Sequence, residues 1–135
     1  RPEGLKPCAY ETIWSVTGNK LNMFLNQRSG DLLAASGAGG INEVQYAALL
    51  LMVARHTGYE PGIFTHFVAN EQIYDRHVKQ AKELVSRAEA VKNVSIMPQL
   101  ILSPSKSDFY NMDISDFIIT DYDPVSPQIS LELGI

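Results

Sequence analysis

The sequence predicts an α+β fold in which a mixed β-sheet is packed by two main helices. Three observations support this class. Apolar and polar residues alternate with a period of two over residues 8–29, as they do in paired strands. Two later segments are expected to be helical, one apolar almost all round and one with apolar residues at helical spacing, and short β-branched or aromatic runs lie beside them. Because strands and helices are mixed along the chain, we expect a strand order that mostly departs from sequence order.

A β-hairpin is the first element expected. Its strands cover residues 8–16 and 20–29, and the turn between them is Thr17-Gly18-Asn19. Strict alternation places every second side chain of a strand on the same face. On the first strand this face would carry Cys8, Tyr10, Thr12, Trp14 and Val16, and on the second strand Leu21, Met23, Leu25, Gln27 and Ser29.

A loop and a helix follow the hairpin. Residues 31–40 are rich in Gly and Ala and have no periodicity, which predicts a flexible loop. Asn42 is a favoured N-cap residue for a helix over 44–57, and Gly58 is a favoured residue just past its end. Because this helix is apolar almost all round, we expect it to be buried.

A strand and an amphipathic helix come next. The β-branched and aromatic run over 63–69 predicts the strand, which follows Pro61 and Gly62. In the helix, apolar residues recur three or four positions apart and form one stripe, while most charged residues point outward. The stripe consists of Ile73, His77, Ala81, Leu84 and Ala88.

The remaining elements are short. A strand is expected over 94–102, where Pro98 favours an edge position or a bulge because proline cannot donate to a strand ladder. A second strand is expected over 117–120, after a loop over 103–111. The tail over 123–135 contains prolines and is expected to be irregular.

Composition limits the classes of function. The 135 residues are enough for one domain, 1–135. The net charge of −4 provides no basic surface for long nucleic acids. A single cysteine cannot form an internal disulfide, and no Cys/His cluster has the spacing of zinc ligands, so we expect no metal and a cytoplasmic location. The longest apolar run, 46–54, is too short to cross a membrane.

Two nearby segments carry groups that could perform chemistry. Cys8 is a nucleophile only as a thiolate, which a nearby positive charge would stabilise. Arg28 is the nearest candidate across the hairpin, and its planar guanidinium, together with the Ser29 hydroxyl, could hold a phosphate. On the residues alone, a buried, inert cysteine and an ordinary polar strand end that enters a turn are the more common roles.

Five separated motifs occur in an order that is more specific than any one of them. They are Pro7-Cys8, Gln27-Arg28-Ser29 with Asp31, Asn42 four residues before Tyr46, Ile73-Tyr74 with His77, and Asp121-Tyr122 leading to Leu133-Gly134-Ile135. Together they resemble the C-terminal half of thymidylate synthase. The resemblance runs from about Leu5 to the last residue and implies a partial thymidylate synthase-like fold.

The resemblance implies a methyltransferase that converts dUMP to dTMP reductively. The implied co-substrate is 5,10-methylenetetrahydrofolate, which would supply both the carbon and the hydride. Cys8 matches the nucleophile that adds to C6 of the pyrimidine, so that C5 can attack the folate methylene group. Arg28 and Ser29 match phosphate ligands, and Arg28 would also favour the thiolate. Asp31, with Gln27 beside it, matches a residue that meets the pyrimidine ring.

Asn42 matches the residue that recognises the base. An amide can accept from N3–H of uracil and donate to O4, whereas an ionised carboxylate would better suit the amine of cytosine. Asn42 therefore favours dUMP over dCMP, although without the family a helix N-cap is the simpler role. Tyr74 matches a residue that hydrogen-bonds the 3′-hydroxyl of the sugar. For His66 and His77 we expect structural roles.

The chain departs from the family pattern in three places. Gln72 stands where the family often has a histidine, and it can hydrogen-bond but cannot change charge. The loop from Asp31 to Asn42 is longer and richer in Gly and Ala than usual. The family's N-terminal half, with further phosphate arginines, a catalytic glutamate and much of the folate pocket, has no counterpart here. We therefore expect a fragment or truncated homologue that by itself binds dUMP weakly and turns over slowly or not at all.

Other functions are compatible with these residues. A dCMP hydroxymethylase-like enzyme would use the same nucleophile and folate but end with water instead of hydride. A catalytically inactive nucleotide-binding or assembly module, or an α+β domain with a buried cysteine, also fits the sequence. The family's sheet-to-sheet packing implies a homodimer, and we expect neither a nucleic acid polymer nor a membrane among the partners.

Overall fold

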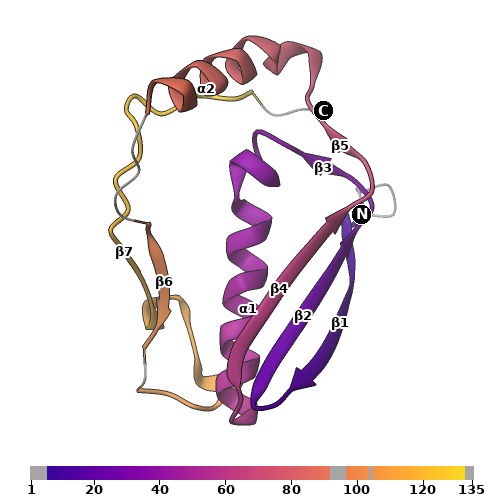
Figure 1. Cartoon of the computed structure of the whole chain (residues 1–135), viewed down its shortest axis with the longest axis vertical. Coiled ribbons are helices and arrows are strands. Elements are labelled where there is room, and N and C mark those ends of the chain that lie inside the picture. The colour runs from indigo at the N-terminus through magenta and orange to yellow at the C-terminus, as the bar shows by residue number, and fades with distance from the viewer. Residues whose placement is uncertain (1–5, 92–96, 104, 133–135) are drawn as a thin grey trace. The chain divides into compact units, whose positions relative to one another are not determined.

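The computed structural model describes residues 6–91, 97–103 and 105–132. The chain divides into two compact units, residues 1–72 and residues 73–135 (Figure 1). Each unit contains an α-helix together with β-strands, so the predicted α+β class is confirmed. That the whole chain forms a single domain stays a prediction. Among the described residues, no helix has the length and apolar character needed to cross a membrane.

A three-stranded mixed sheet forms the body of the first unit. β1 (Ala9–Thr17) pairs antiparallel with β2 (Lys20–Gln27), and β2 pairs parallel with β4 (Glu60–Val68). The predicted hairpin is therefore confirmed, and its turn uses Gly18 at a φ of 63°, which glycine adopts without strain. A parallel pair needs a crossover connection, and α1 (Ile41–Thr57) provides it.

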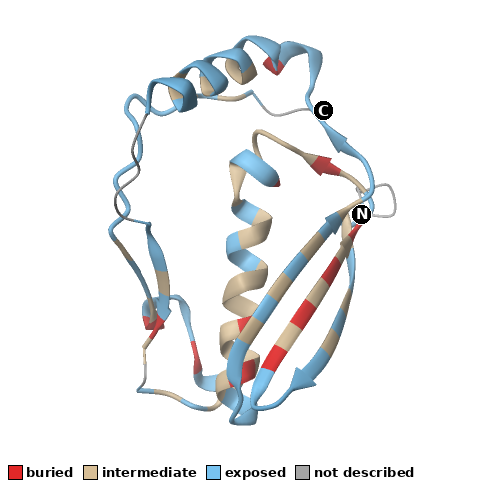
Figure 2. Cartoon of the chain, in the orientation of Figure 1, coloured by how far each residue is buried: buried red, intermediate tan, exposed pale blue. Residues whose placement is uncertain are grey.

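The core of the first unit lies between one face of this sheet and α1 (Figure 2). Along β2, Leu21, Met23 and Leu25 are buried while the residues between them are not, as the alternation predicted. Within α1, Leu50 and Ala54 are buried and most other positions are half-exposed or exposed. The expectation of a fully buried helix is wrong, because one sheet face covers only one side of it.

A β-bulge changes the direction of side chains at the start of β1. Ala9 pairs with Gln27, but the next pair is Glu11 with Asn26, so Tyr10 is the extra residue. Residues directly opposite one another share a face, and Ala9 therefore lies on the same face as Gln27. Tyr10 is 64% exposed. The strict alternation predicted from Cys8 onward is broken here, and bulges of this kind re-aim side chains at functional sites.

Both ends of α1 have glycine caps. The helix begins at Ile41, three residues earlier than predicted, with Gly40 at a φ of 66° as its N-cap. The expectation that Asn42 caps the helix is wrong, because Asn42 lies inside the first turn and its side chain bonds elsewhere. Gly58 ends the helix at a φ of 78°, and its N–H bonds to carbonyls in the last turn, as predicted.

The segment predicted as a flexible loop contains hydrogen-bonded structure. β3 (Gly30–Asp31) pairs parallel with β5 (Glu71–Gln72), which follows β4 directly. The Asp31 carboxylate accepts the backbone N–H groups of Leu33 and Ala34, each at 3.2 Å. A 3₁₀ turn over Gly37–Gly39 then leads into α1. The loop prediction failed because local side-chain bonds, which carry no periodic signal, define this segment.

The second unit has one helix and a two-stranded sheet. α2 (Val78–Ala90) follows a 3₁₀ turn over Asp75–His77. β6 (Gln99–Leu102) pairs antiparallel with β7 (Phe117–Thr120), which matches its predicted bounds. Two further 3₁₀ turns, Phe109–Asn111 and Ile114–Asp116, precede β7.

Some predicted features of the second unit differ from the structure. β6 begins just after Pro98, so the proline precedes the strand instead of interrupting it. The residues 94–96 of that predicted strand lie outside the described residues. Ile73 precedes the helical turns and is therefore not part of the apolar stripe of α2.

The C-terminal tail is held against α2 by side-chain bonds to its backbone. Arg87 donates to the carbonyl oxygens of Val125, at 3.4 Å, and Pro127, at 2.5 Å. Nε2 of His77 lies 2.9 Å from the carbonyl oxygen of Glu132. His77 is 1% exposed, which supports the structural role expected for it. The described part of the tail has no helix or strand, as predicted.

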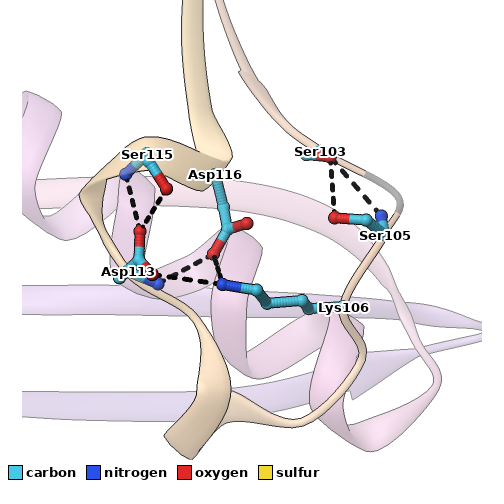
Figure 3. Close-up of polar contacts among 6 residues, drawn as sticks. All are labelled: Ser103, Ser105, Lys106, Asp113, Ser115 and Asp116. Atoms are coloured by element: carbon cyan, nitrogen blue, oxygen red, sulfur yellow. Dashed lines mark hydrogen bonds and ion pairs between the residues drawn. The ribbon is translucent and has the colours of Figure 1, made fainter.

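An ionic cluster closes the turn before β7 (Figure 3). Nζ of Lys106 lies 3.1 Å from the Asp113 carboxylate and 2.9 Å from that of Asp116. The Ser115 hydroxyl and backbone N–H also donate to Asp113. These two hydrogen bonds lower the pKa of Asp113 from 3.8 to about 2, and the hydrogen bond from Lys106 is the next-largest cause of this shift. Hydrogen bonding to Lys106 lowers the pKa of Asp116, and the same pairing raises that of Lys106.

The turn is expected to loosen in acid. Because the folded-state pKa of Asp113 is depressed, its stabilisation is complete above pH 3.8 and is lost as the pH falls toward 2. Ser115→Ala removes the largest cause and should raise the pKa of Asp113 toward 3.8, whereas Ser107→Ala should not. Carboxyl NMR titration measures both values. An unchanged pKa in Ser115→Ala would show that the serine does not hold the carboxylate.

Candidate active site

Cys8 and Arg28 lie side by side at one end of the sheet of the first unit. β1 begins just after Cys8, and β2 ends just before Arg28. The ladder that pairs Ala9 with Gln27 continues for one more bond, in which the N–H of Arg28 donates to the carbonyl oxygen of Cys8 at 2.9 Å. Cys8 is half-buried and Arg28 is exposed. The structure thus brings together the two residues that the sequence placed across the hairpin.

The Arg28 side chain is anchored at this strand end. Nη2 donates to the carbonyl oxygen of Lys6 at 2.9 Å. A guanidinium has five N–H groups, so this bond uses one of them. The positive charge is thereby held next to the backbone that leads into Cys8, at an exposed position that a dissolved anion can reach.

Gln27 connects the end of β2 to the first turn of α1. Its side chain is buried, at 1% exposure, and Nε2 donates to the carbonyl oxygen of Ser29 at 2.9 Å. Its Oε1 accepts from Nδ2 of Asn42 at 3.0 Å. This bond explains why Asn42 does not cap its helix. It also ties the first turn of α1 to the strand end that carries Arg28, because Arg28 directly follows Gln27 in the chain.

Two residues without a predicted functional role complete this cluster. His66 on β4 has Nε2 3.1 Å from Oε1 of Gln27, and Nδ1 2.8 Å from Oε1 of Glu43. The His66 ring also stacks on Phe64, with centroids 6.1 Å apart. Period-two alternation along β4 could have placed His66 on the covered face. No sequence pattern marked Glu43, although it directly follows Asn42.

Beside this cluster, Gly30 lies in a tightly packed corner. The hydroxyl of the buried Ser36 donates to Oε1 of Glu71 at 2.6 Å. A Cβ atom on Gly30 would overlap Ser36 Oγ and lie 2.7 Å from Oε2 of Glu71. A side chain at this position, directly after Ser29, would therefore require Ser36 and Glu71 to move.

The remaining predicted site residues lie in two places. Gln72 pairs with Asp31 through β3 and β5, so both belong to the first unit, and the Asp31 carboxylate is occupied by its own turn. Tyr74 belongs to the second unit, where its ring contacts His77 edge-on at 5.7 Å. Across the described residues, no group of three or more His, Cys, Asp or Glu side chains is arranged to hold a metal ion.

Taken together, the first unit is an α+β module that gathers a thiol, an arginine and a pair of buried or half-buried amides at one strand end. Comparison with known proteins identifies the family of the chain. The thymidylate synthase family model matches residues 2–135. The chain therefore belongs to the thymidylate synthase family, as the sequence motifs predicted.

Individual relatives have similar sequences and a similar fold. The chain is 39% identical over 138 residues to the thymidylate synthase of Streptococcus agalactiae, and 40% identical over 140 residues to that of Streptococcus mutans. These alignments cover 98% and 100% of the chain but 47% and 48% of the relatives. The chain thus spans about half the length of these curated relatives.

A solved structure supports the predicted fold. The thermostable thymidylate synthase A from Bacillus subtilis matches with a TM-score of 0.77 and 32% sequence identity. The match covers 93% of this chain and 42% of the Bacillus chain. The partial thymidylate synthase-like fold expected from the sequence is confirmed.

Substitution of Gly30 tests the packed corner. Gly30→Ala should lower the free energy of unfolding by about 1–3 kcal/mol, because the new methyl group overlaps Ser36 and Glu71. Adding Ser36→Ala removes the nearest atom, so the double variant should lose less than the sum of the single variants. Urea unfolding measures all four proteins. Strict additivity would contradict the packing described for this corner.

Proposed function

We propose that this chain provides the nucleotide-reacting part of a thymidylate synthase, which methylates dUMP to dTMP with 5,10-methylenetetrahydrofolate. The single observation that carries the proposal is the adjacency of Cys8 and Arg28, linked by a 2.9 Å backbone bond. It supplies a nucleophile and a phosphate ligand from one strand end. Membership of the family supports the particular reaction.

In this proposal Arg28 and Ser29 hold the phosphate and so bring the pyrimidine to Cys8. The thiolate adds to C6, the C5–C6 double bond opens, and the electron pair at C5 attacks the folate methylene carbon. The attack breaks one of the two bonds between this carbon and the folate nitrogens, and loss of the C5 proton breaks the other, which leaves an exocyclic methylene group at C5. Hydride transfer from the released tetrahydrofolate to this group forms the methyl group as the thiolate leaves C6, which gives dTMP and dihydrofolate and returns Cys8 unchanged. A covalent nucleophile contributes by dividing one difficult substitution into an addition and an elimination. The folate supplies the carbon and the hydride.

Recognition of the base is assigned to Asn42. Its amide would donate to O4 and accept from N3–H of uracil. Gln27 supports Asn42 through the 3.0 Å bond, and we place Asp31 and Gln72 near the pyrimidine and sugar. Tyr74 is proposed to bind the 3′-hydroxyl. These assignments follow the family motifs, residue by residue.

The chain spans about half of its relatives, which bears on its activity. The family's N-terminal half carries further phosphate arginines, a catalytic glutamate and much of the folate pocket. We propose that the 135 residues alone bind dUMP weakly and turn over slowly or not at all. We also propose a cytoplasmic location, because the reaction requires Cys8 as a free thiol and a reducing compartment maintains it.

The alternatives are less well supported. A dCMP hydroxymethylase-like enzyme would share the nucleophile, but the Asn42 amide, with one N–H committed to Gln27, suits uracil, and the relatives compared above are thymidylate synthases. A catalytically inactive binding or assembly module would keep the fold without forming a covalent adduct. Trapping of the nucleophile therefore separates an enzyme from such a module.

The trapping experiment uses 5-fluoro-dUMP with 5,10-methylenetetrahydrofolate. The reaction must lose a proton from C5, and a fluorine at C5 cannot be lost in its place, so the covalent adduct persists. At its full encoded length the polypeptide should gain the mass of one nucleotide and one folate, on Cys8. Cys8→Ala should form no adduct. Arg28→Ala should lower the adduct-forming rate at subsaturating nucleotide about tenfold or more, because it removes a charged hydrogen bond to phosphate.

Lys20→Ala, at the opposite end of β2, is the matched control for Arg28→Ala and should react at the wild-type rate. Intact mass spectrometry measures the adduct. An adduct that survives Cys8→Ala, or none in the wild-type polypeptide, would contradict the assignment of the nucleophile.

We further propose that the open face of the sheet forms a homodimer interface. α1 covers one face, and the opposite face carries exposed apolar residues on β1 and β4, including Ile13, Ile63 and Phe67. Ile13 lies opposite Phe24 in the ladder, so these side chains belong to the same face. A sheet face of this kind is typical of an association surface.

Sedimentation velocity tests this interface. The wild-type polypeptide should sediment as a dimer, and Phe67→Glu should shift it toward monomer, because it places a charge in an apolar contact. Val16→Glu is the control, since Val16 pairs with Leu21 on the other face. A wild-type monomer at high concentration would contradict the proposed dimer.

A further inference from the structure

We propose that Glu43 and His66 are positioning residues for base recognition. They hold the Gln27 amide, and through it Asn42, in the orientation that distinguishes uracil from cytosine. This inference rests on the proposed function, because it requires that Asn42 face the base. It is carried by four side chains from β2, β4 and α1 that meet in one hydrogen-bonded chain.

The orientation of Gln27 is the first part of this chain. Nε2 donates to the carbonyl oxygen of Ser29 at 2.9 Å, so Oε1 is the end that faces His66 and Asn42. A flipped amide would direct its oxygen at the Ser29 carbonyl, and two acceptors would meet in a buried place. Because Gln27 is 1% exposed, water cannot relieve that contact.

Two donors then converge on Oε1 of Gln27. Nδ2 of Asn42 lies 3.0 Å away and Nε2 of His66 lies 3.1 Å away. A carbonyl oxygen has two lone pairs and can accept both bonds, but it cannot donate. Nε2 of His66 must therefore carry a hydrogen.

Glu43 holds the other side of the ring. Its Oε1 lies 2.8 Å from Nδ1 of His66 and also accepts the N–H of Gly37 at 3.0 Å. Oε2 of Glu43 is buried and has no hydrogen-bond partner among the described residues, so the contacts of Oε1 fix the carboxylate. Stacking on Phe64 restrains the ring plane. His66 is thus held from both nitrogens and from one face.

These contacts leave the Asn42 amide only one of its two possible orientations. A free Asn amide can recognise uracil in one orientation and cytosine in the other, since a 180° flip exchanges its donor and its acceptor. Here one N–H of Asn42 is committed to Gln27, and a flip would place Oδ1 against Oε1 of Gln27. The orientation that remains keeps one N–H and Oδ1 for O4 and N3–H of uracil.

The test measures binding of three ligands to the polypeptide at its full encoded length. They are dUMP, dCMP and 2-deoxyribose 5-phosphate, which has the sugar and phosphate but no base. His66→Phe keeps a ring on Phe64 and removes both nitrogens. It should lower the dUMP-over-dCMP preference roughly fivefold to tenfold, the effect of one hydrogen bond, and leave the affinity for the sugar phosphate unchanged. Isothermal titration calorimetry measures each dissociation constant.

Glu43 variants provide a second, independent measurement. Glu43→Leu should lower the preference in the same way, whereas Glu43→Gln should retain most of it, because a Gln amide can still pair with Nδ1 of His66. Glu60→Leu changes an exposed carboxylate at the far end of β4 and should leave all three affinities unchanged. Circular dichroism confirms that each variant is folded.

The outcomes separate this inference from the proposed function. An unchanged preference in both His66→Phe and Glu43→Leu, with the preference abolished in Asn42→Ala, would overturn the positioning role and leave the function standing. An equal loss for all three ligands would also overturn it, because it indicates a general structural role. A wild-type polypeptide that shows no preference for dUMP would contradict the proposed function and this inference with it.

Discussion

The candidate site depends on the antiparallel pairing of β1 with β2. This ladder sets residues far apart in the sequence next to each other, and its last bond joins the N–H of Arg28 to the carbonyl of Cys8. Burial of Leu21, Met23 and Leu25 fixes the register, because a slip by one residue would turn that apolar face to water. The same burial that stabilises the first unit therefore sets the spacing of the thiol and the guanidinium.

Polar groups at the end of this ladder are arranged by three elements at once. Gln27 continues the buried face of β2, so its amide must find partners inside the protein. It finds them in Asn42 at the start of α1, in His66 on β4 and in the carbonyl of Ser29. The N-terminus of α1 is thereby tied to the strand end that carries Arg28, which couples the base-recognition candidate to the phosphate candidate.

Local sequence patterns predicted the elements correctly where they were strong. They failed where a single hydrogen bond determines the position of a side chain. The hairpin, the glycine after α1 and the strand over 117–120 could all be predicted from local patterns. Asn42 was predicted to cap its helix, but a bond to Gln27, 15 residues away, competes successfully for its side chain. His66 and Glu43 meet across 23 residues through the parallel pairing of β4, which no local pattern encodes. The predicted hairpin already placed Arg28 across from Cys8, and the family motifs added an expected role for each.

The most direct test is a crystal structure of the polypeptide, at its full encoded length, with dUMP bound. The account predicts that the phosphate contacts the Arg28 guanidinium and Ser29, that Sγ of Cys8 faces C6 of the ring, and that the Asn42 amide faces O4 and N3. A phosphate bound away from Arg28, or a Cys8 sulfur enclosed by hydrocarbon and turned away from the pyrimidine, would contradict it.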